Sequence, residues 1–126
     1  MKKTISTDNA PAAIGAYSQA VVASNHVYVS GQIPLDPATG DIVSPNFADQ
    51  ARQVFRNLTE IAKAANASLD DAVKLTVYLT DLNDFAQLNE IMADFVSQPY
   101  PARAAVQVSA LPKGAKIEID AVLVIE

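Results

Sequence analysis

PARAAVQVSALPKGAKIEIDAVLVIE, residues 101–126, closes the chain with two strand-like segments, about 103–110 and 116–125, around a Pro-Lys-Gly turn. From Ala121 to Ile125 every residue is apolar, so both sides of the strand would carry apolar side chains, which is typical of a strand buried on both sides. Arg103 stands at the start of the first segment and Glu118 inside the second. Because an unpaired buried charge costs several kcal/mol at least, each of these charges either faces solvent or is held for a ligand.

Patterns of strand and helix alternate upstream of this stretch. Residues 19–33 predict two strands around a Ser24-Asn25 turn, and residues 73–80 predict a third strand. Ser44-Pro45 predicts the N-cap and first residue of a long helix, whose apolar stripe is Phe47, Ala51, Val54, Leu58, Ile61 and Ala65. A second amphipathic helix is expected over about 83–97, ended by Pro99 and Pro101.

This order of elements predicts one α+β (mixed α/β) domain over residues 1–126, with both helices on one face of a mixed sheet. The other sheet face then meets either solvent or another subunit. Half of the residues are hydrophobic and only 18% are charged. A monomer of this size requires fewer apolar residues, so we expect an oligomer.

Composition argues against several classes of function. The net charge of -5 and the lack of a Lys/Arg cluster argue against nucleic acid as a partner. With no cysteine and one histidine, His26, neither a thiolate nor a zinc site is expected. No apolar run reaches the ~20 residues of a membrane span, and no signal peptide follows Met1, so the expected location is the cytoplasm.

Five separated blocks resemble the Rid family, the reactive intermediate deaminases also called YjgF-like proteins. The blocks are APAAIGAYSQA (10–20), SGQIPLDPATG (30–40), QARQVFRNL (50–58), LTDLNDFAQLNEI (79–91) and the closing PAR…KIEI segment. The resemblance implies a chorismate-mutase-like fold with a six-stranded mixed sheet. It also implies a homotrimer whose sheets form a central barrel, with one site in each cleft between neighbouring subunits.

The same resemblance implies hydrolysis of 2-imino acids, such as 2-iminobutanoate and 2-iminopropanoate, to 2-oxo acids and ammonia, without a cofactor or metal. Arg103 would bind the substrate carboxylate and Glu118 would hold the attacking water. Four further residues match positions around the site, namely Tyr17, Ser30, Gly31 and Asn89, and Ala105 would line the site through its backbone. Ala105 stands where the best-known branch carries cysteine, so a thiol contribution is not expected here.

These residue types suit that chemistry. A guanidinium grips a carboxylate with two parallel N–H···O bonds and so fixes the orientation of the adjacent C=N bond. A carboxylate on a water molecule can take its proton as the water attacks carbon. From the residues alone, Arg103 and Glu118 could instead form a structural ion pair or be solvated strand charges.

Two other classes of function stay open at this stage. The apolar composition fits a non-catalytic trimer that binds small carboxylates or shields unfolded chains. RNA cleavage is the third alternative, and the acidic charge counts against it.

Overall fold

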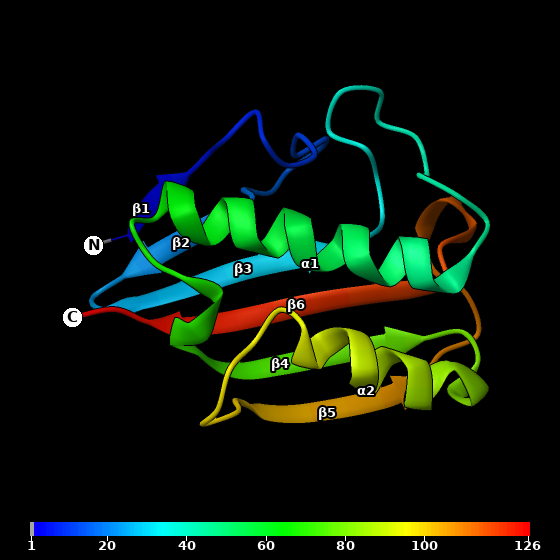
Figure 1. The fold of residues 1–126 in the computed structure, drawn as a ribbon. Coiled ribbons are helices and arrows are strands. Elements are labelled where there is room, and N and C mark those ends of the chain that lie inside the picture. The colour runs from blue at the N-terminus through cyan, green and yellow to red at the C-terminus, as the bar shows by residue number, and fades with distance from the viewer. Residues whose placement is uncertain (1) are drawn as a thin grey trace.

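The computed structural model describes residues 2–126 and shows a six-stranded mixed sheet with two helices packed on one face (Figure 1). The strands are β1 (Lys2–Ile5), β2 (Ala20–Ala23), β3 (His26–Gln32), β4 (Ala72–Leu79), β5 (Ala102–Gln107) and β6 (Ile117–Val124). The helices are α1 (Phe47–Ala64) and α2 (Phe85–Ala93), with 3₁₀ turns η1 (Leu69–Asp71), η2 (Leu82–Asp84) and η3 (Pro112–Gly114). The predicted α+β class, with both helices on one face, is confirmed.

The closing strand β6 lies in the middle of the sheet, whose order is β1-β2-β3-β6-β4-β5. It pairs antiparallel with β3 and β4, whereas the edge strand β5 runs parallel to β4. Its odd-numbered residues, from Ile117 to Leu123, are buried under the helices. Its even-numbered residues, from Glu118 to Val124, are half-buried on the uncovered face. A single chain therefore buries one side of β6 fully and the other only in part.

The apolar stripe predicted for the long helix faces the sheet, because all six of its residues are buried. The start of that helix was predicted wrongly. Asn46 is the N-cap, and its side chain accepts a hydrogen bond from the Asp49 N–H at 3.2 Å. Ser44 instead accepts from the Asn46 N–H and donates to the Asp49 carboxylate, so it supports the cap from outside the helix.

The second helix is shorter than predicted, since α2 covers Phe85–Ala93 and not 83–97. The chain turns after Ala93, and the N–H groups of Phe95 and Val96 both donate to the Met92 carbonyl. The Phe95 ring then stacks on Phe55 with centroids 5.2 Å apart. Packing of this aromatic pair accounts for the early end, before either proline is reached.

The residue patterns missed the first strand, β1, which pairs antiparallel with β2. Of its four residues only Ile5 is buried, so the sequence has no alternation to reveal it. The closing strands are also shorter than predicted: β5 ends at Gln107 and β6 spans Ile117–Val124. The Pro-Lys-Gly turn between them is confirmed as η3.

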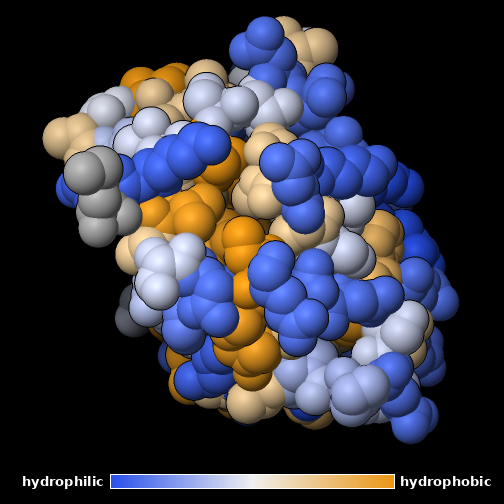
Figure 2. Space-filling model, turned by 90° about the vertical axis from the view of Figure 1, so that its left-hand side faces the viewer, coloured by the Kyte–Doolittle hydropathy of each residue, from blue (hydrophilic) through white to orange (hydrophobic). Residues whose placement is uncertain are grey.

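The face of the sheet away from the helices carries apolar side chains at the surface. Tyr28 of β3 is 49% exposed and lies across from Val122 of β6, which is itself half-buried. Figure 2 shows a hydrophobic band between hydrophilic regions at the end of the molecule where both termini lie. Apolar side chains at the surface, on the uncovered face and at this end of the molecule, suit contact with another protein chain.

Candidate active site

Arg103 is held by one face of α2. It lies across from Leu75 of β4, whose side chain is buried under the helices, so it projects from the helix side of the sheet. Its Nη1 donates to Oδ1 of Asn89 at 2.6 Å and lies 3.6 Å from the Met92 sulfur. The guanidinium carbon also lies 5.0 Å from the centroid of the Phe85 ring, a cation–π contact. These contacts fix the guanidinium and leave its other nitrogens free for a ligand.

A hollow of about 400 Å³ opens beside this arginine. Its lining residues are Asn89, Met92, Ala93, Tyr100, Pro101 and Arg103. Among these only Arg103 is charged, so the hollow combines one cation with apolar walls. That combination suits a small molecule with a carboxylate and a short side chain.

Ala105 belongs to the same side of the sheet as Arg103. It lies two residues further along β5 and pairs with the buried Val77 of β4. Its small side chain packs against the core and is partly buried. The structure therefore groups Ala105 with Arg103 and Asn89.

Glu118 projects from the opposite side of the sheet. On β6 it lies between the buried Ile117 and Ile119, and it pairs with Tyr78 of β4 on the uncovered face. Gly31 of β3 lies against it, because a Cβ atom on Gly31 would collide with Oε2 of Glu118 and lie 3.0 Å from its carboxyl carbon. Only glycine at position 31 leaves room for the carboxylate where it is.

Ser30 ties the neighbouring loop to β3. Its Oγ donates to the Ser18 carbonyl at 2.6 Å, and its N–H donates to the Gln19 carbonyl at 2.9 Å. These bonds fix the segment that follows Tyr17, whose side chain is 55% exposed. Tyr17 lines a separate hollow of about 290 Å³ formed by residues of the 4–8 and 12–19 segments.

The predicted residues thus form two groups on opposite faces of the sheet. Arg103, Asn89 and Ala105 form the group at α2 and β5. Gly31 and Glu118 form the other on β3 and β6, with Ser30 and Tyr17 beside it. A single chain does not bring Arg103 and Glu118 together.

The surroundings of Glu118 increase the proton affinity of its carboxyl group. Burial, and then the negative charge of Asp120, raise the pKa of the Glu118 carboxyl above its usual value. Within residues 2–126 no hydrogen bond or ion pair reaches this carboxylate. It is therefore a half-buried acid that is available to a water molecule or a substrate.

Four contact residues were not predicted as part of a site. Phe85 and Met92 belong to the segment predicted as the second amphipathic helix and were given no role at the site, yet both touch Arg103. Their spacing of four and three residues from Asn89 puts all three on one helix face, which was a usable signal. Tyr78 and Asp120 lie beside Glu118 on the uncovered face and were given no role either.

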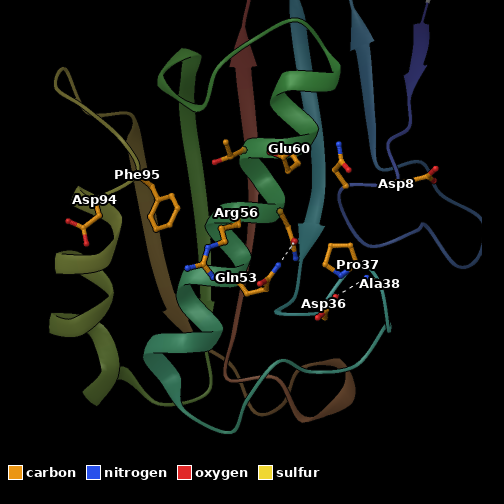
Figure 3. Close-up of a pocket in the computed structure, with 12 residues that line it drawn as sticks. Asp8, Asp36, Pro37, Ala38, Gln53, Arg56, Glu60, Asp94 and Phe95 are labelled. Carbon is orange, nitrogen blue, oxygen red and sulfur yellow. Dashed lines mark hydrogen bonds between the residues drawn. The ribbon is translucent and has the colours of Figure 1, made fainter.

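A larger hollow, about 680 Å³, lies elsewhere on the helix side (Figure 3). It is lined by α1, the 36–38 loop and the end of α2, and holds none of the predicted residues. Arg56 is the one cation among its lining residues, beside four carboxylates, namely Asp8, Asp36, Glu60 and Asp94. That charge balance repels an anion, so the smaller hollow at Arg103 is the better candidate.

The described residues also bear on the class of site. Over residues 2–126 no three His, Asp or Glu side chains cluster as metal ligands would. The helices of that same range include none with the length and apolar character needed to cross a bilayer.

The chain is similar to known proteins over nearly its whole length. Residues 7–125 match the family model described as Endoribonuclease L-PSP. A 2-iminobutanoate/2-iminopropanoate deaminase of Rattus norvegicus is 52% identical over 124 residues, which cover 98% of this chain and 90% of that protein. A RutC family protein of Pyrococcus horikoshii is also 52% identical, over 97% of each chain. The crystal structure of RidA from an Antarctic Psychrobacter superimposes with a TM-score of 0.94 at 56% identity, covering 98% of this chain and 99% of that one.

Proposed function

The chain belongs to the Rid family of YjgF-like proteins, and on that basis we propose that it is a hydrolytic deaminase of small 2-imino acids. The proposed substrates are 2-iminobutanoate and 2-iminopropanoate, and the products are the 2-oxo acids and ammonia. Cytoplasmic amino-acid metabolism is the proposed setting. The observation that carries the proposal is the Arg103 guanidinium, fixed by Asn89 and Phe85 at the wall of a hollow of small-molecule size.

We further propose that the active protein is a homotrimer in which Arg103 of one subunit faces Glu118 of its neighbour. Two features support this arrangement. Arg103 and Glu118 project from opposite faces of one sheet, so a second copy is needed to bring them to one substrate. The face that carries Glu118 has no helix over it and exposes Tyr28 and Val122, which suit burial against another subunit.

In this proposal Arg103 binds the substrate carboxylate through two parallel N–H···O bonds. Because Nη1 is already engaged by Asn89, the guanidinium plane is fixed before substrate arrives. Charge-assisted bonds of this kind contribute about 1.5–3 kcal/mol to binding, and the planar geometry also orients the C=N bond. Orientation matters because water must approach the imine carbon from one side.

Glu118 supplies the acid–base chemistry. Its carboxylate accepts a proton from water as the water oxygen forms a bond to the imine carbon, and it then gives that proton to the nitrogen, which has taken the electron pair of the C=N π bond. The resulting carbinolamine gives its hydroxyl proton to Glu118, which passes it to the nitrogen as the C–N bond breaks, so that ammonia leaves and the C–O bond becomes the carbonyl of the 2-oxo acid. Glu118 is suited to this transfer because its raised pKa brings its proton affinity closer to neutral pH.

The remaining residues shape the site in this proposal. Gly31 makes room for the Glu118 carboxylate, and Ser30 fixes the loop that presents Tyr17. Ala105 lines the cleft through its backbone. Because position 105 is alanine, the reaction proceeds without a thiol at that position.

The experiment follows the decay of 2-iminobutanoate generated by a threonine dehydratase. Wild type is expected to accelerate decay, and Arg103→Ala to lower kcat/KM by roughly 10- to 100-fold or more. Arg56→Ala is the matched control, because Arg56 is an exposed arginine in the larger hollow and is expected to keep full activity. Decay at the uncatalysed rate with wild type rules out the deaminase. Suppression of client aggregation that Arg103→Ala leaves unchanged supports the holdase alternative.

A further inference from the structure

Three ionisable side chains lie next to one another on the uncovered face of the sheet. Tyr78 of β4 pairs directly with Glu118 of β6. Asp120 lies two residues beyond Glu118 on the same strand and therefore on the same face. The Tyr78 hydroxyl donates to Oδ2 of Asp120 at 3.2 Å. The phenol that stands across from Glu118 is thus engaged by the neighbouring carboxylate.

The consequence for Glu118 is that it keeps a free carboxylate. A hydrogen bond from the Tyr78 hydroxyl to Glu118 would stabilise the ionised form and lower its proton affinity. Asp120 removes that donor and also places a second negative charge nearby. Both effects act in the same direction, towards a Glu118 that holds a proton more strongly.

We propose that Asp120 is a positioning residue that makes Glu118 a stronger proton acceptor, both through its charge and by engaging the Tyr78 hydroxyl, which could otherwise donate to Glu118. The inference deepens the function proposed above and rests on it, because it assumes that Glu118 handles the proton of the attacking water. Neither residue needs to touch the substrate. A general base works best when its proton affinity is close to the working pH, and Asp120 moves Glu118 in that direction.

The charges and the burial of these groups act in the direction that this geometry implies. Burial first, and Asp120 second, raise the pKa of Glu118. Burial, then the charge of Asp120 and its hydrogen bond, then Glu118, raise the pKa of Tyr78, so the phenol stays a donor at neutral pH. The three groups therefore behave as one cluster in which Tyr78 holds its proton and Glu118 is the group that exchanges it.

Other ionisable groups on this face lie further along the strands. Lys116 precedes Glu118 by two residues and is exposed, while Lys74 of β4 and Tyr28 of β3 both pair with Val122, beyond Asp120. From β3 the residue that faces Glu118 is the uncharged Gly31. In the proposed trimer Arg103 of a neighbour would oppose the effect of Asp120. A comparison between variants of the same assembly keeps all of these contributions constant.

The test is a carboxyl ¹³C NMR titration of Glu118 in wild type, Asp120→Asn and Tyr78→Phe, with no substrate present. Asp120→Asn keeps the shape and an acceptor for Tyr78 but removes the charge, so its Glu118 midpoint is expected below the wild-type midpoint. Tyr78→Phe leaves the charge of Asp120 in place, so its midpoint is expected at or above wild type. Asp120→Glu restores the charge and is expected to raise the midpoint above that of Asp120→Asn.

An unchanged or higher Glu118 midpoint in Asp120→Asn overturns the proposal. An equal fall of the midpoint in Asp120→Asn and Tyr78→Phe also overturns it, because it would indicate a general loosening of the face. The pH profile of kcat/KM is the second readout. Its acidic limb is expected to move to lower pH in Asp120→Asn and not in Tyr78→Phe. Shifted NMR midpoints in a protein without deaminase activity would refute the proposed function alone. Full activity with unshifted midpoints would refute the role of Asp120 alone.

Discussion

Arg103 and Glu118 project from opposite faces of the same sheet, Arg103 towards α2 and Glu118 away from both helices. The strand pairings determine this. Arg103 pairs with the buried Leu75, whereas Glu118 pairs with Tyr78 on the uncovered face. Two groups separated in this way cannot act on one small molecule within a single chain. Their cooperation requires a second copy, and that requirement is open to direct test.

Subunit complementation is the sharpest check. Arg103→Ala and Glu118→Gln are each expected to be nearly inactive, because each removes one half of every site. If the halves come from different subunits, random mixing after joint refolding restores about a quarter of wild-type activity, since each mixed trimer contains one intact site. No recovery from a mixture that demonstrably forms mixed trimers contradicts the inter-subunit site.

Gly31→Ala is expected to abolish most deaminase activity with a modest loss of stability. The added methyl group occupies the space of Oε2 of Glu118, so the carboxylate has to move. A displacement of this kind costs on the order of 100-fold in rate. Chemical unfolding of Gly31→Ala, Glu118→Ala and the double variant checks the cause. The destabilisation by Gly31→Ala should largely vanish when Glu118 is shortened, and an additive cycle contradicts the clash.

Phe85→Leu is expected to raise KM by roughly two- to thirty-fold with a smaller change in kcat. The substitution removes the ring that lies 5.0 Å from the Arg103 guanidinium but keeps an apolar side chain on α2. Steady-state kinetics on the imine gives both constants. Phe47→Leu, at a buried position of α1, is the matched control and is expected to alter stability without altering KM.

Glu118 also predicts how stability depends on pH. Its pKa in the fold is raised above the ordinary value of 4.5, so the folded state binds more protons than the unfolded state between those two values. Stability is then lost as pH rises through the folded pKa. Glu118→Gln cannot ionise and is expected to be more stable than its parent at pH 7, with the difference disappearing below the unfolded pKa.

Arg103 of a neighbouring subunit would stabilise the ionised Glu118 carboxylate and so reduce this effect of pH on stability. The comparison is therefore made in Arg103→Ala, by chemical unfolding at several pH values and one fixed protein concentration. The gain from Glu118→Gln is expected to be larger in Arg103→Ala than in wild type. An equal gain in both backgrounds contradicts the approach of Arg103 to Glu118.

Much of the fold follows from local pattern. The four-three spacing on α1 marks a buried face, and the structure buries those residues. On β4 the structure buries Leu75, Val77 and Leu79 but leaves Val73 exposed, and on β6 it buries the odd-numbered residues and half-buries the even-numbered ones. Patterns failed where no periodicity exists, as in β1 with one buried residue, and where distant packing intervenes. The stacking of Phe95 on Phe55 ends α2 before the prolines, and no local signal in the 83–97 segment announces it.

The sequence by itself determined both helices and five of the six strands to within a few residues, the family and the identity of the two charged candidates, because periodicity and motif blocks are properties of neighbouring residues. Only the tertiary structure decided which residues share a face and which touch. It placed Phe85 and Met92 on Arg103, Gly31 against Glu118 and Tyr78 on Asp120. Those contacts depend on strand order and register, which join residues far apart in the chain and cannot be obtained from local alternation.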